Sequence, residues 1–455
     1  MSKTSKKILS LLLSMAILIS ITACGSSSAP TTSTGDASST SSSTSPSPST
    51  PAPTVEKVTI TFPTEGVGLS MGAKWTTEMT DKFKELYGDT IELKVEEIPN
   101  AQSLWDKMQV LMNAKNLPDI LMETGRNILP MVIDAGQAVD LTPYIDADPE
   151  WKALMDPDAI AQNSRDGKIY AVPSSKMVVG YYYNKELFKK AGIEGPAKTW
   201  DEFFADCEKL KAIGVAPMSM DTGDEGWITT LLLGSMIGTD GAEGNKFMNT
   251  TYPETYQVPV FINNVKKIQE CFQKYTTSDA VGGKYENGAS NFFAEKTAMI
   301  FNGSWMIGNF TDTRLVSADF NAKVDCAAYP SNGMYNAPRY GYFVGSNTKE
   351  KADAAVKYIK LITGAEGMIR GFELFGAMPA SNSLVIPEKS AQIQPLGAKL
   401  NVFANTATYK YKTYDILWYT PVRTALVTQY PLLAAGDITA EQFAKALDDA
   451  AKSAQ

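Results

Sequence analysis

An apolar run of β-branched and aromatic residues from Met177 to Tyr183 predicts a buried β-strand. A turn at Asp166-Gly167 and a short strand from Lys168 to Val172 come before it. Pro173 separates the two strands, and a short helix from Leu187 to Ala191 follows the second one. A strand that ends at a proline and restarts as a second strand is typical of a segment that crosses between two bodies of a protein.

Strand and helix patterns alternate in a βαβαβ order before this crossing. The strands are short apolar or alternating runs, and each helix has an apolar face with residues three or four positions apart. The predicted strands are Val58–Phe62, Ile91–Val95 and Asp119–Met122, and the helix faces are Trp75, Met79, Phe83 and Leu86, then Leu104, Met108, Leu111 and Met112. This order predicts a parallel sheet with helices on its faces, which is an α/β fold.

More helices and strands follow the crossing. A capping box at Thr199–Glu202 predicts the start of a helix, and the run Ile228–Ile237 predicts an apolar helix. A strand is predicted at Met299–Phe301, with a turn at Asn302-Gly303 that leads into another helix. The segment Arg339–Val344 is predicted to be a return strand.

The start of the chain has the pattern of an export signal. Residues 1–23 begin with lysines and continue with an apolar core from Ile8 to Ile21, which is shorter than the roughly 20 residues of a membrane span. This pattern predicts a secretory signal peptide. The sequence Ile21-Thr22-Ala23-Cys24 resembles a bacterial lipobox, in which the cysteine is diacylated and becomes the mature N-terminus. The alternative is an ordinary signal peptide that is cut near Ala23.

A low-complexity segment follows Cys24. From Gly25 to Thr54 every residue except Asp36 is Ser, Thr, Ala, Pro or Gly. Such a segment has no apolar surface to offset its ordering entropy, so we predict that it is a disordered tether. The predicted region of residues 24–55 contains this tether and the lipidated Cys24.

Composition narrows the possible functions. The chain has 455 residues, of which 44% are hydrophobic, and its formal net charge is −8. This charge argues against a nucleic-acid partner, and the length is sufficient for two domains. The chain has no histidine, which excludes Ser-His-Asp and Cys-His catalysis and HExxH zinc sites. After Cys24, three cysteines remain, Cys207, Cys271 and Cys326, so at most one disulfide can form within the chain; Cys207 is expected to be a buried free thiol.

Motifs for a cofactor or metal are weak, so we expect neither. Gly66-x-Gly68 followed by Gly72 misses the dinucleotide pattern by one residue. In Asp146-x-Asp148-x-Glu150, Trp151 replaces the glycine that a calcium loop needs, so a solvated acidic turn is expected. The 50 acidic residues leave glycoside hydrolysis by paired carboxylates as an enzymatic alternative, although no pair lies in a recognisable motif.

The order of several short motifs resembles that of extracellular solute-binding proteins of ABC importers, the sugar-binding branch called family 1. The motifs are Leu117-Pro118-Asp119-Ile120, Tyr183-Asn184-Lys185, Gly303-Ser304-Trp305 and Gly376-Ala377-Met378-Pro379, and the resemblance covers about residues 58–452. It implies a two-lobe, α/β periplasmic-binding-protein-like fold of type II with a hinge between the lobes. We expect residues 56–174 and 333–380 in the N-terminal lobe and residues 175–332 and 381–455 in the C-terminal lobe.

The same resemblance implies a function. We expect a lipid-anchored monomer on the extracellular side of a Gram-positive cell membrane, with no catalytic activity. It would capture a carbohydrate, such as an oligosaccharide, between its lobes and deliver it to membrane permease subunits. A binding protein for a polyamine or a peptide remains an alternative, as does a secreted glycoside hydrolase.

Aromatic residues at loop or element ends are candidates for stacking on sugar rings, which present flat C–H faces. In the family, the Gly-x-Trp tryptophan and an aromatic residue near the C-terminal helices commonly take this role, which implies Trp305 and Trp418. Trp227 lies where family members often place a ring, and Tyr340 is a further candidate. Trp75, on a helical apolar face, is expected in the core instead.

Polar candidates complete the predicted site. Glu123 follows the third strand, and ligands of open parallel sheets bind at the carboxyl ends of the strands. Arg126 lies in the same loop, while Asp221 and Asp415 come shortly before Trp227 and Trp418. Lys176 lies in the crossing, where family members often place a polar contact to the ligand.

Overall fold

A computed structural model of the chain describes residues 56–68, 72–99, 101–122, 128–223, 226–345 and 348–454, with only the backbone of residues 101 and 102. The predicted signal peptide, Cys24, the tether, Glu123 and Arg126 lie outside the described residues. The described residues belong to one compact unit.

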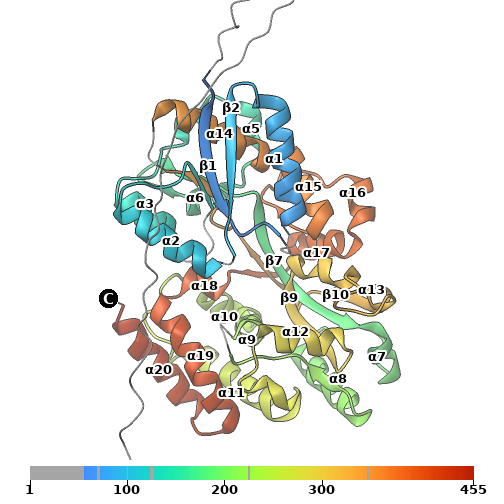
Figure 1. Cartoon of the computed structure of the whole chain (residues 1–455). Helices are drawn as coiled ribbons and strands as arrows, with labels where there is room; N and C mark the ends of the chain where they lie inside the picture. Colours follow the sequence, from blue (N-terminus) through green and yellow to red (C-terminus); the bar gives the residue numbers. More distant parts are fainter. Residues whose placement is uncertain are drawn as a thin grey trace, which may run out of the picture. The chain divides into compact units, whose positions relative to one another are not determined.

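The strand β7 (Ser175–Asn184) is the centre of the largest sheet and confirms the strand predicted from the apolar run. It forms antiparallel backbone hydrogen bonds with β9 (Thr297–Gly303), β10 (Val324–Ala327), β11 (Gly333–Ala337) and β13 (Met378–Pro379). Nine of its ten residues are buried, as expected for a strand with an apolar sequence and covered faces. Figure 1 shows β7 running diagonally, with α15 near its first residues and α7 after its last.

The sheet around β7 mixes parallel and antiparallel pairs. Its path runs β14-β11-β7-β9-β8, in which β14 (Tyr409–Tyr411) is parallel to β11 and β8 (Ala216–Met218) is parallel to β9. Segments that are far apart in the sequence therefore meet on one strand, which makes the fold depend on long-range pairing.

The N-terminal strands agree with the predicted order, with one difference. β1 (Val58–Thr64) and β2 (Ile91–Glu97) pair in parallel over seven residues, as predicted. β3 (Ile120–Met122) instead pairs antiparallel with β12 (Tyr342–Val344), which also pairs with β6 (Ala171–Val172). The carboxylate of Asp119 accepts hydrogen bonds from the backbone N–H and hydroxyl of Thr61 in β1, at 2.9 and 3.0 Å, so a side chain links β1 to the start of β3.

The helices before β7 cover this N-terminal part. They are α1 (Ala73–Tyr87), α2 (Ala101–Asn113), α3 (Ile128–Asp134), α4 (Thr142–Asp146), α5 (Pro149–Leu154) and α6 (Pro157–Gln162). The hairpin of β4 (Ser164–Arg165) and β5 (Lys168–Ile169) has positive φ at Asp166 and Gly167, which confirms the predicted turn.

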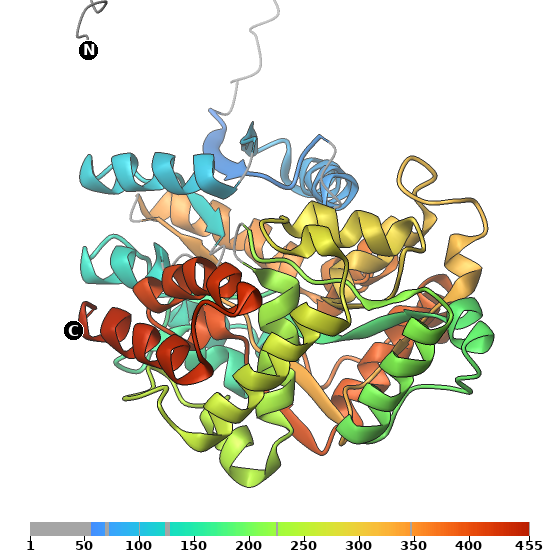
Figure 2. The same ribbon diagram turned by 90° about the horizontal axis from the view of Figure 1, so that it is seen from below.

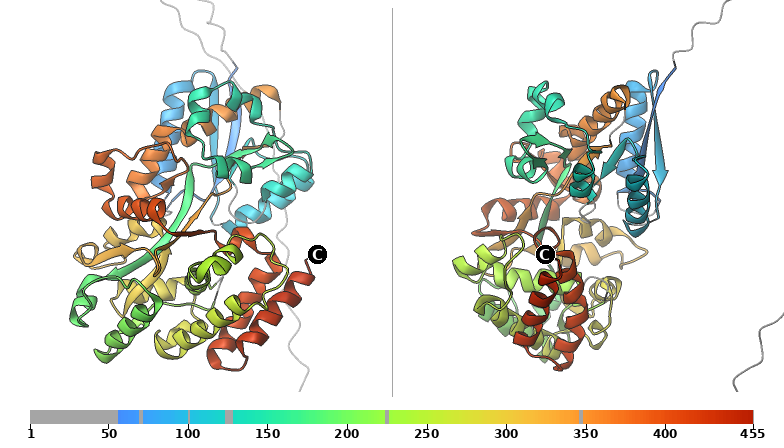
Figure 3. Two further views of the ribbon diagram at one scale, coloured as in Figure 1. Left: turned by 180° about the vertical axis from the view of Figure 1, so that it is seen from behind. Right: turned by 90° about the vertical axis from the view of Figure 1, so that its left-hand side faces the viewer.

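The helices after β7 include the predicted ones. They are α7 (Lys185–Lys190), α8 (Trp200–Ala212), α9 (Trp227–Gly238), α10 (Gly241–Phe247), α11 (Pro259–Lys274), α12 (Tyr285–Phe293), α13 (Phe320–Lys323), α14 (Lys349–Thr363), α15 (Ala365–Phe375), α16 (Glu388–Ile393), α17 (Pro395–Thr406), α18 (Tyr414–Leu417), α19 (Thr420–Ala435) and α20 (Ala440–Lys452), with 3-10 helices η1 (Ser278–Ala280) and η2 (Ser304–Thr311). The capping box at Thr199 and Glu202 is confirmed in both directions. α19 and α20 lie side by side and pack on α11 (Figures 2 and 3).

The predicted turn at Asn302-Gly303 is wrong, because both residues belong to β9. Asn302 pairs with Gly180 and Gly303 with Val179 of β7. The amide of the Asn302 side chain donates a hydrogen bond to the hydroxyl of Tyr285, the first residue of α12, at 2.9 Å. A dipeptide that favours turns is thus held extended by the neighbouring strand.

The apolar core is divided into three clusters. The largest gathers β7, most of the elements that follow it and the C-terminal helices, and it also takes Met334, Phe372 and Met378. Two smaller clusters contain residues from the elements before Pro173. The second cluster also takes Tyr342, Val344 and the buried face of α14, and the third takes Phe343. The predicted lobe boundaries, including the assignment of residues 333–380 to the N-terminal lobe, remain predictions.

Two further findings concern the described residues. Cys207, Cys271 and Cys326 are buried free thiols, as predicted for Cys207. Within the described ranges, we find no helix with the length and apolarity required to cross a membrane.

Gly180 provides a test of the central strand. A Cβ atom at Gly180 would collide with the carbonyl oxygen of Ala327 in β10. We therefore expect Gly180→Ala to lower the free energy of unfolding by about 1–3 kcal/mol, the usual cost of overpacking. Urea unfolding measures this change. Gly195→Ala is the matched control because nothing lies within 4 Å of its Cβ position. Equal stability of the two variants would contradict the close approach of β7 and β10.

Candidate ligand-binding site

A pocket of about 490 Å³ lies among the ends of several elements, and its volume is typical of sites for small molecules. The lining residues come from the end of β1 and the loop after it, the start of α1, the loop after β2, the end of β3, the crossing into β7, η2, the segment that leads into β12, and the α15 region. They are Thr64, Glu65, Gly66, Gly72, Trp75, Thr76, Pro99, Met122, Ser174, Ser175, Trp305, Arg339, Tyr342, Gly367, Met368, Gly371, Phe375 and Ala377. The wall therefore mixes apolar surface with hydroxyl and charged groups.

The pocket lies at the carboxyl ends of N-terminal strands. Thr64 is the last residue of β1, and Met122 is the last residue of β3. Open α/β sheets bind ligands at this edge, because the loops that follow the strands converge there. Glu123 directly follows Met122 but, like Arg126, is outside the described residues, so both remain predictions.

Trp305 is the predicted aromatic residue that lines this pocket. It is half-buried and packs against the largest core cluster, whereas most of the other lining residues come from the N-terminal part. A Cβ atom at Gly303 would overlap the indole ring, so the ring folds back over its own backbone. The Gly-x-Trp motif thus has a steric cause: only glycine leaves room for this orientation.

Trp227 lies beside Trp305, so the structure brings two of the predicted rings together. Their ring centroids are 6.1 Å apart with an interplanar angle of 51°. The Tyr414 ring also lies next to Trp227, at 5.7 Å, and 6.0 Å from the Trp418 ring. Trp227 is itself half-buried and is the first residue of α9.

Trp418 and Tyr340 are placed differently from Trp305. Trp418 is only 2% exposed and packs edge-on against the rings of Phe247, Tyr256 and Phe261, so its ring offers little surface to a ligand in this conformation. Tyr340 is partly buried against the third core cluster. Its neighbour Arg339 lines the pocket instead.

Asp221 is fully buried and supports the start of α9. One oxygen of its carboxylate accepts a hydrogen bond from the backbone N–H of Thr229 at 3.1 Å, and its carbonyl accepts one from the Thr229 hydroxyl at 2.6 Å. These bonds fix the first turn of α9 and with it the position of Trp227. Burial, together with the charge of Asp221, raises the pKa of Tyr285, although the hydrogen bond from Asn302 opposes this effect.

Lys176 and Asp415 are not among the residues that line the pocket. Lys176 is 7% exposed, and burial lowers the pKa of its amine, while the nearby Asp156 carboxylate opposes this shift. Asp415 is half-buried in the first turn of α18. Both assignments as ligand contacts remain predictions.

Several lining residues were missed from the sequence. Thr64, Ser174 and Phe375 belong to no recognisable motif. They line the pocket only because segments that are distant in the sequence meet there. Trp75 is in the core, as predicted, at 6% exposure, and its indole N–H donates to the carbonyl of Gly367 at 2.8 Å. One part of it nevertheless borders the pocket.

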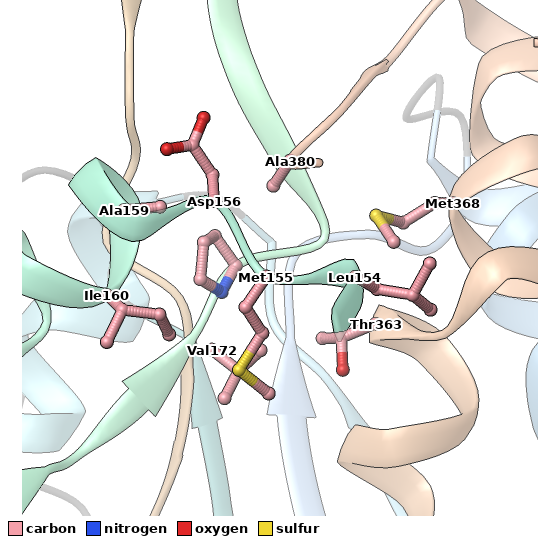
Figure 4. A pocket seen from close by; sticks show the side chains of 10 residues that line it. Leu154, Met155, Asp156, Ala159, Ile160, Val172, Thr363, Met368 and Ala380 are labelled. Atoms are coloured by element: carbon pink, nitrogen blue, oxygen red, sulfur yellow. The ribbon is translucent and has the colours of Figure 1, made fainter. Parts of the chain in front are cut away.

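A second hollow, beside the crossing, is too small for a ligand. Its volume is about 10 Å³, close to the minimum for one water molecule. Figure 4 shows the apolar side chains of Met155 and Val172 together, while the carboxylate of Asp156 points away from them. This hollow is a packing defect next to Pro173 and carries no functional assignment.

Comparison with known proteins finds curated relatives that match part of this chain. The multiple sugar-binding protein of Streptococcus mutans is 28% identical over 244 residues, which are 50% of this chain and 55% of that protein. An sn-glycerol-3-phosphate-binding periplasmic protein of Yersinia pseudotuberculosis is 28% identical over 195 residues, 41% of each chain. The chain thus spans about half the length, or less, of these curated relatives.

Solved structures show the same fold. A chitin oligosaccharide binding protein aligns with a TM-score of 0.74 at 22% identity, over 88% of this chain and 99% of that one. A Streptococcus pneumoniae solute-binding protein in complex with the blood group A-trisaccharide aligns with a TM-score of 0.73 at 23% identity, over 87% and 100%. The predicted mixed α/β fold of solute-binding proteins is therefore confirmed.

The family model described as bacterial extracellular solute-binding protein matches residues 78–431, which is most of the chain. The resemblance noted from the sequence motifs is confirmed at this level, and the chain belongs to the family of bacterial extracellular solute-binding proteins.

Proposed function

We propose that this protein captures a carbohydrate in the pocket at Trp305 and delivers it to the permease subunits of an ABC importer. The observation that carries the proposal is the half-buried indole of Trp305 at a pocket of about 490 Å³, with Trp227 6.1 Å away. An aromatic ring covers the flat C–H face of a sugar, and its few torsions limit the entropy lost on binding. The hydroxyl groups of a sugar also need polar partners, which Thr64, Ser174 and Arg339 offer.

The placement of the pocket supports capture by closure. Trp305 is held by the largest core cluster, and Thr64 and Met122 belong to the N-terminal strands. A ligand that touches both sides binds the closed form more tightly and shifts the equilibrium towards it. The predicted lobes, with the hinge at the crossing near Pro173, provide the two bodies for this motion.

The relatives supply a second line of support and one alternative. The names of the Streptococcus mutans protein and of two structural neighbours include sugars or oligosaccharides. The glycerol-phosphate-binding relatives favour a small phosphorylated polyol as the alternative ligand, for which Arg339 would be the anion partner. In either case the protein binds its ligand without making or breaking a bond, since the family and its neighbours are binding proteins.

A ligand panel tests the proposal. The mature protein is titrated with malto-, chito- and xylo-oligosaccharides, raffinose, glycerol 3-phosphate and spermidine, and its tryptophan fluorescence is recorded. We expect a saturable change in tryptophan fluorescence with at least one sugar, because Trp305 lines the pocket and Trp227 packs beside it. Saturation with glycerol 3-phosphate or spermidine alone would overturn the sugar assignment, and new reducing ends in the recovered glycan would indicate a hydrolase.

Trp305→Ala should weaken the binding of that sugar by about 1–3 kcal/mol, since it removes the ring from the pocket. Calorimetry is the measurement, because it does not depend on the indole signal. Gly303→Ala should weaken binding as well, since its methyl group would displace the ring. Trp200→Phe, in α8 and outside the lining, is the control that should keep full affinity. Unchanged affinity in a folded Trp305→Ala protein would refute the location of the site.

We further propose that diacylated Cys24 anchors the protein to the outer face of the cell membrane, since two acyl chains bind stably where one does not. Cells that express the natural chain should incorporate an alkyne palmitate analogue into the protein, which should fractionate with membranes. Cys24→Ala should lose both properties. Unlabelled wild-type protein in the culture medium would favour an ordinary signal peptide.

A further inference from the structure

Tyr252 and Tyr419 form a stacked pair on the surface of the C-terminal part. Their ring centroids are 4.3 Å apart and their planes differ by 19°. Tyr252 is 46% exposed, which makes it the most exposed aromatic side chain in the described part of the chain. One face of its ring rests on Tyr419, so the exposed remainder is a flat apolar surface with a hydroxyl at its edge.

The backbone of Tyr252 adopts a conformation that is strained for a residue with a bulky side chain. Its φ angle is +54°, in the left-handed region that glycine adopts freely and bulky residues adopt only with strain. Such strained residues persist where the surroundings over-determine them, and they cluster at functional sites. A glycine at this position would remove the strain but also the ring.

Hydrogen bonds fix the loop that carries Tyr252. Its backbone N–H donates to the carbonyl of Leu417 at 2.7 Å. A few residues on, the buried carboxylate of Asp448 in α20 accepts from the Tyr256 N–H at 2.6 Å and from the Thr255 hydroxyl at 2.8 Å. The exposed ring is therefore presented by a rigid segment, which lowers the entropy cost of any contact with it.

A series of packed aromatic rings leads from the pocket to the residue that precedes Tyr419. Tyr419 directly follows Trp418, whose ring is 6.0 Å from Tyr414, and Tyr414 is 5.7 Å from Trp227 beside Trp305. Tyr414 and Trp418 are 3% and 2% exposed and serve as support. The Tyr252–Tyr419 pair thus follows directly, along the chain, on a series of packed rings that leads to Trp305.

We propose that Tyr252 and Tyr419 form a second carbohydrate-stacking site, which holds the far end of an oligosaccharide whose near end occupies the pocket at Trp305. This inference rests on the proposed function and specifies its substrate class, a linear oligosaccharide rather than a mono- or disaccharide. A pyranose ring packs against the open face of Tyr252, and its hydroxyl groups remain in water.

The experiment compares affinities along a chain-length series. Wild-type protein, Tyr252→Gly and Tyr252→Phe are titrated by calorimetry with the dimer to hexamer of malto-, chito- and xylo-oligosaccharides. Tyr252→Gly removes the ring and relieves the positive φ, so its thermal unfolding should not occur at a lower temperature. Tyr252→Phe keeps the stacking surface and is the matched control.

For the sugar series that binds, we expect Tyr252→Gly to weaken the longer members by roughly tenfold, equivalent to about 1.4 kcal/mol, and to leave the dimer unchanged. Tyr252→Phe should bind like wild type at every length. Equal affinity of Tyr252→Gly and wild type for all lengths would overturn the second site while leaving the pocket intact. If Tyr252→Gly weakens the dimer as much as the hexamer, the ring belongs to the pocket and the inference is also overturned. Absence of binding to every series by wild type would refute the proposed function itself.

Discussion

The hydrogen bonding of β7 to four other strands is the interaction on which the rest of the structure depends. Because β7 is buried on both faces, most of its residues are apolar. Because Val179 of β7 pairs with Gly303, the last residue of β9, β7 fixes where β9 ends. The Tyr182 hydroxyl also donates to the Gly303 carbonyl at 2.9 Å. η2 starts at the next residue, so the orientation of Trp305 follows from the registry of β7 and β9.

In the candidate site, the residues that hold the tryptophans in place are buried, whereas Trp227 and Trp305 themselves are half-buried. Asp221 and Tyr414 are buried; Asp221 fixes the first turn of α9, which begins at Trp227, and Tyr414 packs against the Trp227 ring. A ring that is already braced by its neighbours loses little freedom when a ligand arrives, so more of the contact energy appears as affinity. This arrangement suits a binding protein, in which selectivity depends on shape and hydroxyl partners and not on a reactive group.

Local sequence signals predicted the elements but not how they meet. Three features could be predicted because their causes lie within a few residues of sequence. They are the buried strand at Met177–Tyr183, the capping box at Thr199 and the turn at Asp166-Gly167. The Asn302-Gly303 turn failed because pairing with β7 outweighs the local preference of the dipeptide. Arg339, Ser174 and Thr64 reach one pocket only through long-range pairing, and the stack of Tyr252 on Tyr419 has the same origin.

In the proposed mechanism the crossing near Pro173 acts as the hinge, and its backbone contacts bear on that role. A Cβ atom at Gly341 would collide with the backbone of Val172 and Pro173, so two crossing segments touch without intervening side chains. Beyond this contact, Ser175 and Lys176 pair with Pro379 and Met378 of β13, which adds a third segment. The proposed rotation would be confined to a few backbone torsions, because the sheet hydrogen bonds of β7 begin immediately after Pro173 and Ser174. In the proposed mechanism, closure therefore moves Trp305 as part of a rigid body, and the energy for it must come from contacts that the ligand makes on both sides of the pocket.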